Sequence, residues 1–306
     1  MFRALFHVYQ KTPAPLRSLV VGLSTVPRLL AKPFVRDVRV GGCSMVLDSS
    51  DNAAFRYWNY RGEYEPRCTE LLLRLISGTP GCYFLDIGAN YGHYTLAVAN
   101  IGRYGLVKRV FSFEPDPVCC HSFAQSSSRN RLGGLVEFSA KLVGDYDGTA
   151  PFLKSPRSST SNRSFESADT SFNTRNNLPC ITIDKFLSDQ GIDVASNRFI
   201  FKMDIEGNEL RAFRGMAKTL AHCAGYAVLF EYWPLGIMEA GIKPSDLREF
   251  ITTMNPDSAY RETDSGFESC TLSEMFVDME HLDARPDHKV TGQYVISRSI
   301  PTPPLS

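Results

Sequence analysis

The segment Phe84–Leu96, FLDIGANYGHYTL, decides the fold of this chain. Its first residues belong to an expected buried strand, since Tyr83–Ile87 is apolar apart from Asp86. In the run Gly88-Ala89-Asn90-Tyr91-Gly92 that follows, two glycines let the backbone turn tightly and approach a ligand without an obstructing Cβ. A helix expected at about Tyr91–Ile101 directs unpaired N–H groups and a positive dipole end toward that ligand. Because an acidic residue near the strand end adds a partner for a cation, a zwitterionic amino-acid tail fits this turn better than a pyrophosphate.

Outward from this turn, apolar runs typical of buried strands alternate with runs of helical spacing. A hairpin is expected at 38–48 and a helix at Cys68–Ser77. Buried strands joined by helices at such spacing indicate an α/β fold with a doubly wound, parallel sheet. The other elements that we predict are strands at Arg109–Glu114, Leu135–Ala140, Phe199–Ile205, Ala227–Tyr232, near Tyr260 and at Tyr294–Ser297, and helices at Pro117–Arg129, Asn208–Leu220 and Pro244–Met254.

Composition narrows the class of protein. The chain has 306 residues, enough for one or two domains and a large core. Its 33 basic and 33 acidic residues give a formal net charge of zero, so no nucleic-acid partner is predicted. The eight cysteines form no C-x-x-C pair, which excludes zinc-ribbon and thioredoxin-like motifs and favours reduced thiols in a cytoplasmic protein.

The N-terminal residues 1–37 are predicted to form a basic helical extension that precedes one domain at 38–300. Residues 1–36 contain basic side chains and no acidic one. Their longest uncharged stretch, Ser18–Pro27, covers only about half of a bilayer span. Three interpretations stay open: a helix packed on the domain, a surface helix in peripheral contact with anionic lipid, and an organellar targeting peptide. The predicted location is therefore cytoplasmic, with membrane association left open.

A serine-rich segment, Lys154–Asn177, interrupts the strand and helix pattern. It has seven serines in 24 residues and almost no apolar side chain. One interpretation is a solvated loop, and the other is a lid beside the substrate. In the second case Arg157, Arg163 and Arg175 would meet an anionic or sugar-bearing substrate.

Chemistry in such a fold is expected at the carboxyl ends of the strands. Glu114 ends the second strand, 26 residues after Gly88, where an acid can accept both ribose hydroxyls of a nucleoside. The glycines do not follow G-x-G-x-x-G, which weakens a nicotinamide-cofactor interpretation.

The predicted fourth strand has an unusual alternation of charged and apolar residues. In Phe201-Lys202-Met203-Asp204-Ile205-Glu206-Gly207, strand periodicity puts Lys202, Asp204 and Glu206 on one side. A central parallel strand tolerates few charges, and burying three of them requires pairing. This stretch is either an internal salt-bridged strut or the ligand edge of the site.

Three stretches, DIGANYGHYTL, FSFEP and KMDIEGNELRAFRGM, resemble the FkbM-type methyltransferases, which use S-adenosylmethionine. Shorter matches extend the resemblance over about residues 38–235: Gly62-Glu63-Tyr64-Glu65, Gly144-Asp145 with Gly148, Ile181–Leu187 and Glu231. The resemblance implies a class I methyltransferase fold, Rossmann-like, with a mostly parallel seven-stranded sheet. It also implies O-methylation of a hydroxyl on a small molecule, sugar or glycolipid.

The resemblance also implies roles for individual residues. The methionine part of the cofactor would be held by Asp86, Gly88, Asn90, Tyr91, Gly92 and Thr95, the ribose by Glu114, and the adenine bordered by Leu142 and Asp145. Asp204 would lie near the methyl centre.

Methyl transfer to an alcohol needs alignment of the reacting atoms and a base for the hydroxyl proton. Asp204 and Glu206 are the first candidates for this base, and Glu231 and His93 the second. A buried Lys202 would keep the carboxylates ionised. Two acids give thin support for a bridging divalent metal, and no metal site is predicted. The alternatives are a methyltransferase-fold binding protein without catalysis and a nicotinamide-dependent oxidoreductase.

Overall fold

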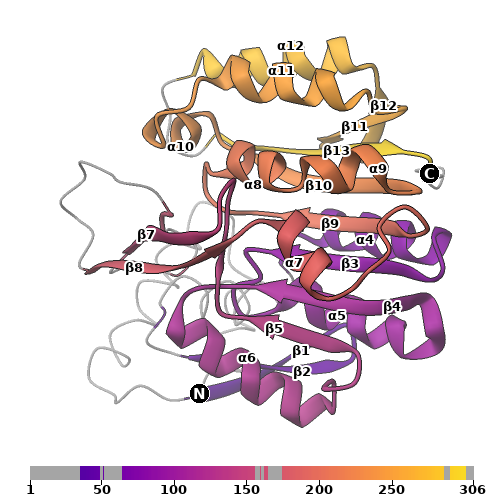
Figure 1. Ribbon diagram of the computed structural model, residues 1–306, viewed down its shortest axis with the longest axis vertical. Helices are drawn as coiled ribbons and strands as arrows, with labels where there is room; N and C mark the ends of the chain where they lie inside the picture. The colour runs from indigo at the N-terminus through magenta and orange to yellow at the C-terminus, as the bar shows by residue number, and fades with distance from the viewer. Residues whose placement is uncertain are drawn as a thin grey trace, which may run out of the picture.

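Eight strands form the central sheet of the computed structural model, in the order β12-β11-β13-β10-β9-β3-β4-β5 (Figure 1). The structure describes residues 35–48, 51, 64–155, 159, 162–164, 174–285 and 290–300. The strands of this sheet are β3 (Cys82–Ile87), β4 (Val107–Phe113), β5 (Val136–Ser139), β9 (Arg198–Met203), β10 (Gly225–Tyr232), β11 (Ser258–Thr263), β12 (Gly266–Cys270) and β13 (Gly292–Arg298).

The five strands from β5 to β10 are parallel, while β13 is antiparallel to both of its neighbours. The parallel part confirms the doubly wound sheet that the sequence predicts. The predicted sheet has seven strands, whereas the observed sheet has eight. The additional strand is β12, which pairs with β11 as an antiparallel hairpin at the edge. That edge strand has only one buried side chain, Phe267, so it lacks the apolar run by which the central strands are recognised.

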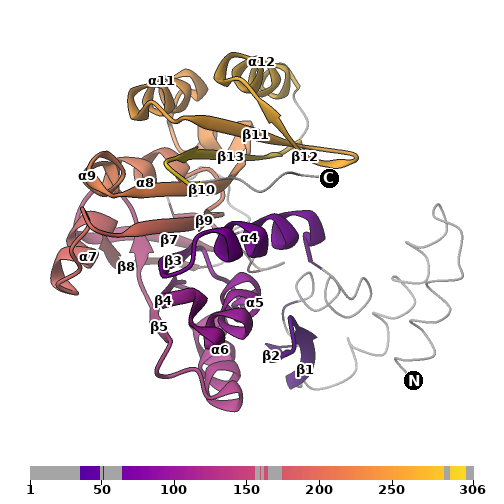
Figure 2. The same cartoon turned by 90° about the vertical axis from the view of Figure 1, so that its right-hand side faces the viewer.

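Helices cover both faces of this sheet (Figure 2). Successive residues of β3 point to opposite faces, so that Phe84 packs in one core cluster and Leu85 in the other. One face carries α4 (Pro66–Gly78), α5 (His93–Ile101) and α6 (Pro117–Asn130), and the other carries α7 (Ile183–Asp189), α8 (Glu209–Gly215), α9 (Ala217–His222), α10 (Pro234–Glu239), α11 (Pro244–Met254) and α12 (Leu272–Asp283).

Two strand pairings lie outside the central sheet. The predicted hairpin is confirmed as β1 (Val35–Val40) paired with β2 (Cys43–Asp48). A second, three-stranded sheet was not predicted: β6 (Leu142–Val143), β8 (Thr174–Ile181) and β7 (Gly148–Lys154). Because β7 takes in Lys154 and β8 takes in residues 174–177, the serine-rich loop between them is shorter than predicted.

Two predicted elements end differently in the structure. The fourth strand stops at Met203 instead of Ile205. The backbone then turns, and Glu206 has a φ of 58°, which no strand residue adopts. Asp204 and Glu206 therefore lie in the loop after β9, and not on one side of a strand. The helix expected at Asn208–Leu220 is two helices, α8 and α9, separated at Met216.

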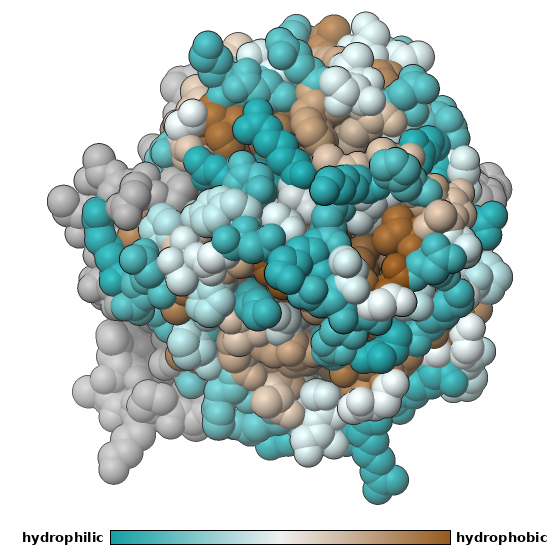
Figure 3. Space-filling model, viewed as in Figure 1, coloured by the Kyte–Doolittle hydropathy of each residue, from teal (hydrophilic) through white to brown (hydrophobic). Residues whose placement is uncertain are grey.

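Some predictions concern residues that the structure does not describe. Residues 1–34 of the N-terminal extension lie outside the described part of the chain, as do residues 52–63 and most of the serine-rich segment. Within the described ranges, no helix is long and apolar enough to cross a membrane. On the face drawn in Figure 3, apolar residues are scattered among polar ones instead of forming one broad patch.

Candidate functional site

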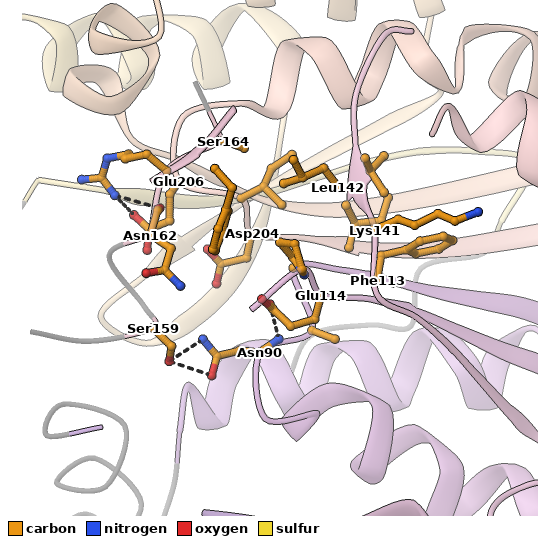
Figure 4. A pocket seen from close by; sticks show the side chains of 18 of the residues that line it. Asn90, Phe113, Glu114, Lys141, Leu142, Ser159, Asn162, Ser164, Asp204 and Glu206 are labelled. Atoms are coloured by element: carbon orange, nitrogen blue, oxygen red, sulfur yellow. Dashed lines mark hydrogen bonds and ion pairs between the residues drawn. The ribbon is translucent and has the colours of Figure 1, made fainter. Parts of the chain in front are cut away.

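A pocket opens at the carboxyl ends of β3, β4 and β9, where the sequence predicts the chemistry. It is open to solvent and spans about 850 Å³, solvent space included. Its lining includes the predicted residues Gly88, Asn90, His93, Glu114, Leu142, Asp204 and Glu206, together with Tyr64, Ile87, Ala89, Tyr94, Phe113, Pro115, Lys141, Val143, Phe152, Ser159, Asn162, Arg163, Ser164 and Ile205. In Figure 4, Asp204 and Glu114 lie between Asn162 and Glu206 on one side and Leu142 and Phe113 on the other.

Gly88 brings the turn after β3 against the loop after β9. Its φ is 85°, and a Cβ built on it would lie 1.9 Å from the carbonyl oxygen of Asp204. The backbone N–H of Asp204 also donates to the carbonyl oxygen of Ile87 at 3.0 Å. The glycine therefore fixes the distance between the turn and Asp204.

Gly88→Ala should lower the free energy of unfolding by about 2–4 kcal/mol, because it adds a clash with backbone to the cost of a positive φ. Gly191→Ala is the matched control, since Gly191 has a φ of 65° and open space around its Cβ position. It should cost only about 1–2 kcal/mol. Urea unfolding of both variants measures the difference, and equal losses would contradict the close approach.

Asp86 lies beneath the turn and does not line the pocket. Its side chain is buried, and one carboxyl oxygen accepts from the backbone N–H and the hydroxyl of Thr95 at 2.9 and 2.6 Å. Burial raises the pKa of Asp86 to about 6, although the bonds from Thr95 and the charge of Lys202 act against that rise. The structure thus gives Asp86 a contact with the start of α5.

Four other predicted cofactor residues also lie away from the lining of this pocket. Thr95 is fully buried and, besides Asp86, contacts Ser112 at 2.6 Å. Tyr91 is fully buried. A Cβ on Gly92 would lie 2.3 Å from the ring of Phe123 on α6. Asp145 lines a neighbouring pocket, which shares Leu142, Val143 and Ser164 with the first.

Glu114, just after β4, is held in a defined orientation at the pocket wall. Its two carboxyl oxygens accept backbone N–H bonds from Asn90 at 2.9 Å and Asp116 at 2.7 Å. It is 7% exposed, and burial raises its pKa to about 7. Phe113 and Leu142 supply apolar wall next to this carboxyl group. A polar edge beside an apolar wall suits a sugar joined to a flat ring.

Residues of the serine-rich segment line the pocket. The sequence alone left two interpretations of this segment open, a solvated loop and a lid beside the substrate. The Asn90 amide donates to the Ser159 hydroxyl at 3.0 Å, and Asn162 donates to Asp116 at 2.9 Å. Arg163 lies 4.3 Å from the Trp233 ring and forms ion pairs with Glu206 and Glu239 at 3.5 and 3.8 Å. Arg163 therefore meets carboxylates of this chain.

Arg157 lies outside the described residues, and Arg175 is exposed on β8.

Lys202 is fully buried between carboxylates that come from separate elements. Its ammonium lies 3.7 Å from Asp204 and 3.5 Å from the side-chain oxygen of Gln293. Burial alone would lower the pKa of Lys202, but the charges of Asp204 and Glu65 raise it above its ordinary value. The lysine therefore stays a cation that offsets the neighbouring acids.

The acids around Lys202 differ in their access to the pocket. Asp204 and Glu206 line it, with 19% and 25% of their side chains exposed. Glu231, the last-but-one residue of β10, does not line it and accepts from Gln293 at 3.4 Å. Burial raises the pKa of Glu206 and Glu231 well above the ordinary value, and the charge of Asp204 adds to the rise.

His93 lines the pocket and contacts the hydroxyl of Thr69 at 3.0 Å. Burial lowers its pKa to about 4, so its ring is neutral near pH 7. All eight cysteines are free thiols. Among the described residues, no group of three or more His, Cys, Asp or Glu side chains is arranged to hold a metal ion.

Sequence reasoning missed residues that come to the site from distant elements. Glu65 directly precedes α4 and hydrogen-bonds to Tyr94, while Gln293 lies on β13 beside Lys202. No sequence motif marks Asn162 as a residue of the site. The only sequence signal for Glu65 is its place in the Gly62–Glu65 stretch.

The order of the strands and the position of the pocket agree with a methyltransferase. A model of the methyltransferase FkbM domain matches residues 86–256, which is more than half of the chain. The chain belongs to the FkbM methyltransferase family. It has the α/β class I methyltransferase fold. No curated protein matches the chain.

Solved methyltransferases are similar to this FkbM family member at low identity. Methyltransferase FkbM from Methylobacillus flagellatus KT is 17% identical, with a TM-score of 0.44, over 78% of this chain and 49% of that one. The chain thus spans about half the length of that protein. An rRNA methylase from Streptococcus thermophilus is 10% identical, with a TM-score of 0.38, over 78% and 100% of the two chains. M. jannaschii TYW2, in complex with AdoMet, is 12% identical, with a TM-score of 0.39, over 87% and 86%.

The chemistry of the pocket fits the cofactor of the FkbM family. Glu114 presents a carboxyl group, which is able to accept hydrogen bonds from ribose hydroxyls, beside the apolar side chains of Phe113 and Leu142. Gly88 lines the pocket and contributes no side chain to it. Asp204 and Glu206 place carboxyl groups at the same pocket, and carboxyl oxygens suit a sulfonium ion.

Proposed function

We propose that this chain transfers the methyl group of S-adenosylmethionine to a hydroxyl oxygen of a small molecule, a sugar or a glycolipid. The observation that supports this function best is that Glu114 and Asp204 line the same pocket. Glu114 would accept hydrogen bonds from the ribose, and Asp204 is an acid that faces the pocket. The cofactor would be held by the backbone at Gly88 and Asn90, by Glu114, and by the apolar wall at Leu142. When bound, it supplies an activated methyl group on a sulfonium sulfur.

Asp204 is the proposed base that takes the proton of the acceptor hydroxyl. It lines the pocket, and its nearest charged partner is the buried ammonium of Lys202 at 3.7 Å, which leaves it able to accept a hydrogen bond. Glu206 is engaged by Arg163 on the other side of the pocket. In this proposal Asp204 holds the acceptor hydroxyl, and the ammonium of Lys202 offsets its charge.

Glu231 and His93 fit the role of base less well. Glu231 lies behind Asp204, next to Gln293, and does not reach the lining. The Nε2 atom of His93 is engaged with the hydroxyl of Thr69 at 3.0 Å, so it is less available to an acceptor hydroxyl. Their part in the proposed reaction is to shape the surroundings of Asp204.

Incubation with S-adenosylmethionine that carries a tritiated methyl group tests this function. A cell extract should supply a small molecule or lipid that gains the label, and base-stable linkage to oxygen would support O-methylation. Calorimetry should show binding of S-adenosylmethionine and no binding of NADH. Label on nitrogen or carbon would contradict the oxygen acceptor, and binding of NADH alone would contradict the cofactor.

A further inference from the structure

The loop after β9 has a backbone conformation that must be held in place. Glu206 has a φ of 58°, a left-handed value that is uncommon for a residue with a side chain. Gly207 follows with a φ of 96°, and a Cβ on it would lie 2.2 Å from the backbone of Gly236 in α10. The loop is therefore pressed against α10 while it turns Glu206 toward the pocket.

Glu209, at the first position of α8, makes the contacts that hold this loop. Its side chain is 1% exposed, and Oε1 accepts the backbone N–H groups of Ile205 and Gly207 at 3.2 and 3.4 Å. These two donors flank Glu206. The second oxygen, Oε2, is buried and has no hydrogen-bond partner among the described residues.

We propose that Glu209 is a positioning residue for methyl transfer, whose buried carboxyl group holds residues 205–207 so that Asp204 and Glu206 face the pocket. Only the catalytic consequence rests on the proposed function, because the two N–H bonds exist without it. Glu209 itself does not line the pocket.

The surroundings of Glu209 favour its uncharged form. Burial raises its pKa to about 7, and the charge of Asp204 adds to that rise, while the backbone N–H groups of Glu209 itself, Ile205 and Gly207 oppose it. An uncharged acid carries its proton on Oε2 and keeps Oε1 as the acceptor. A glutamine would preserve this arrangement, since its carbonyl oxygen takes the place of Oε1.

Two substitutions separate the reach of the side chain from its charge. Glu209→Gln keeps the reach and removes the charge, whereas Glu209→Asp keeps the charge and shortens the side chain by one methylene. Glu274→Asp is the matched control, because Glu274 in α12 is exposed and also accepts a backbone N–H, from Thr271.

Amide hydrogen exchange, measured by NMR, tests directly whether Glu209 holds residues 205–207 in place. In Glu209→Asp the amides of Ile205 and Gly207 should exchange about tenfold faster, since each loses its acceptor. Both rates should stay within about twofold of wild type in Glu209→Gln and Glu274→Asp. Unchanged exchange in Glu209→Asp would overturn the proposal.

The rate of methyl transfer in the labelled extract measures how the Glu209 substitutions affect catalysis. Glu209→Asp should lower kcat at least about tenfold, while the KM for S-adenosylmethionine changes less than about threefold, because Gly88 and Glu114 are outside the loop. Glu209→Gln should restore wild-type kcat. A loss in Glu209→Gln equal to that in Glu209→Asp would show that methyl transfer requires the carboxyl group itself and not only the reach of the side chain, and would overturn a positioning role. Absence of transfer by the wild-type chain would contradict the proposed function instead, and hydrogen exchange would still decide whether Glu209 holds the loop.

Discussion

Asp204→Asn is expected to lower kcat for methyl transfer by about 10²- to 10⁴-fold, the contribution of a positioned general base. Asparagine has nearly the same size and still accepts a hydrogen bond from the acceptor hydroxyl, but it cannot take the proton. The side chain is partly exposed at the pocket, so the fold should persist. Initial rates with the acceptor found in the labelled extract measure the loss, and calorimetry shows whether the cofactor still binds.

Asp264→Asn is the control for this prediction, since it makes the same chemical change on an exposed residue between β11 and β12. It should have wild-type kcat. If Asp204→Asn is equally active, Asp204 is not the base, and Glu206→Gln becomes the next variant to measure, because Glu206 is the other predicted acid that faces the pocket from this loop.

Glu114→Gln is expected to weaken cofactor binding about 10- to 150-fold, the effect of losing a hydrogen bond to a charged group. The ribose is common to S-adenosylmethionine and S-adenosylhomocysteine, so both affinities should fall by the same factor. Calorimetry with the two compounds checks this. A loss confined to S-adenosylmethionine would place Glu114 near the sulfonium ion and would contradict its assignment to the ribose.

Cofactor affinity should also depend on pH through Glu114. Its pKa in the unliganded protein is about 7, and the ionised form is the better acceptor for ribose hydroxyls. Affinity should therefore be nearly constant above pH 8 and fall about tenfold between pH 8 and pH 6, as the carboxylate gains a proton.

Other acids titrate in the same range, so a variant is needed to isolate Glu114. Asp86 and Glu209 have a pKa of about 6 and about 7. The difference between the pH profiles of wild type and Glu114→Gln gives the part due to Glu114. Identical slopes in the two profiles would assign the pH dependence to the remaining acids.

Stability should show the opposite trend with pH. A carboxyl group whose pKa is raised on folding binds more protons in the folded state, so its contribution to stability is largest at low pH. That contribution is lost as pH rises from the unfolded pKa of about 4.5 through the folded value of about 7. Through Glu114, a rise in pH therefore strengthens cofactor binding, which needs the ionised group, and lowers stability, because the folded state favours the neutral group.

The order of strands and helices could be predicted because it depends on local patterns. A strand is predicted from an apolar run such as Phe84–Ile87, and a helix from the helical spacing of apolar residues in Cys68–Ser77. Neither prediction needs knowledge of distant parts of the chain. Short or half-exposed elements gave no such signal. The edge strand β12 and the three-stranded sheet around β8 are examples, and they form because a neighbouring strand offers hydrogen bonds.

The sequence by itself determined that Gly88, Glu114 and Asp204 follow strands of a parallel sheet, whose carboxyl ends lie at one edge. Only the tertiary structure decided which polar side chains face the pocket. Asp86 turns toward Thr95 beneath it, and Arg163 approaches from a distant segment to pair with Glu206. The direction of a side chain depends on the partners packed around it, and those partners come from parts of the chain that no local pattern connects.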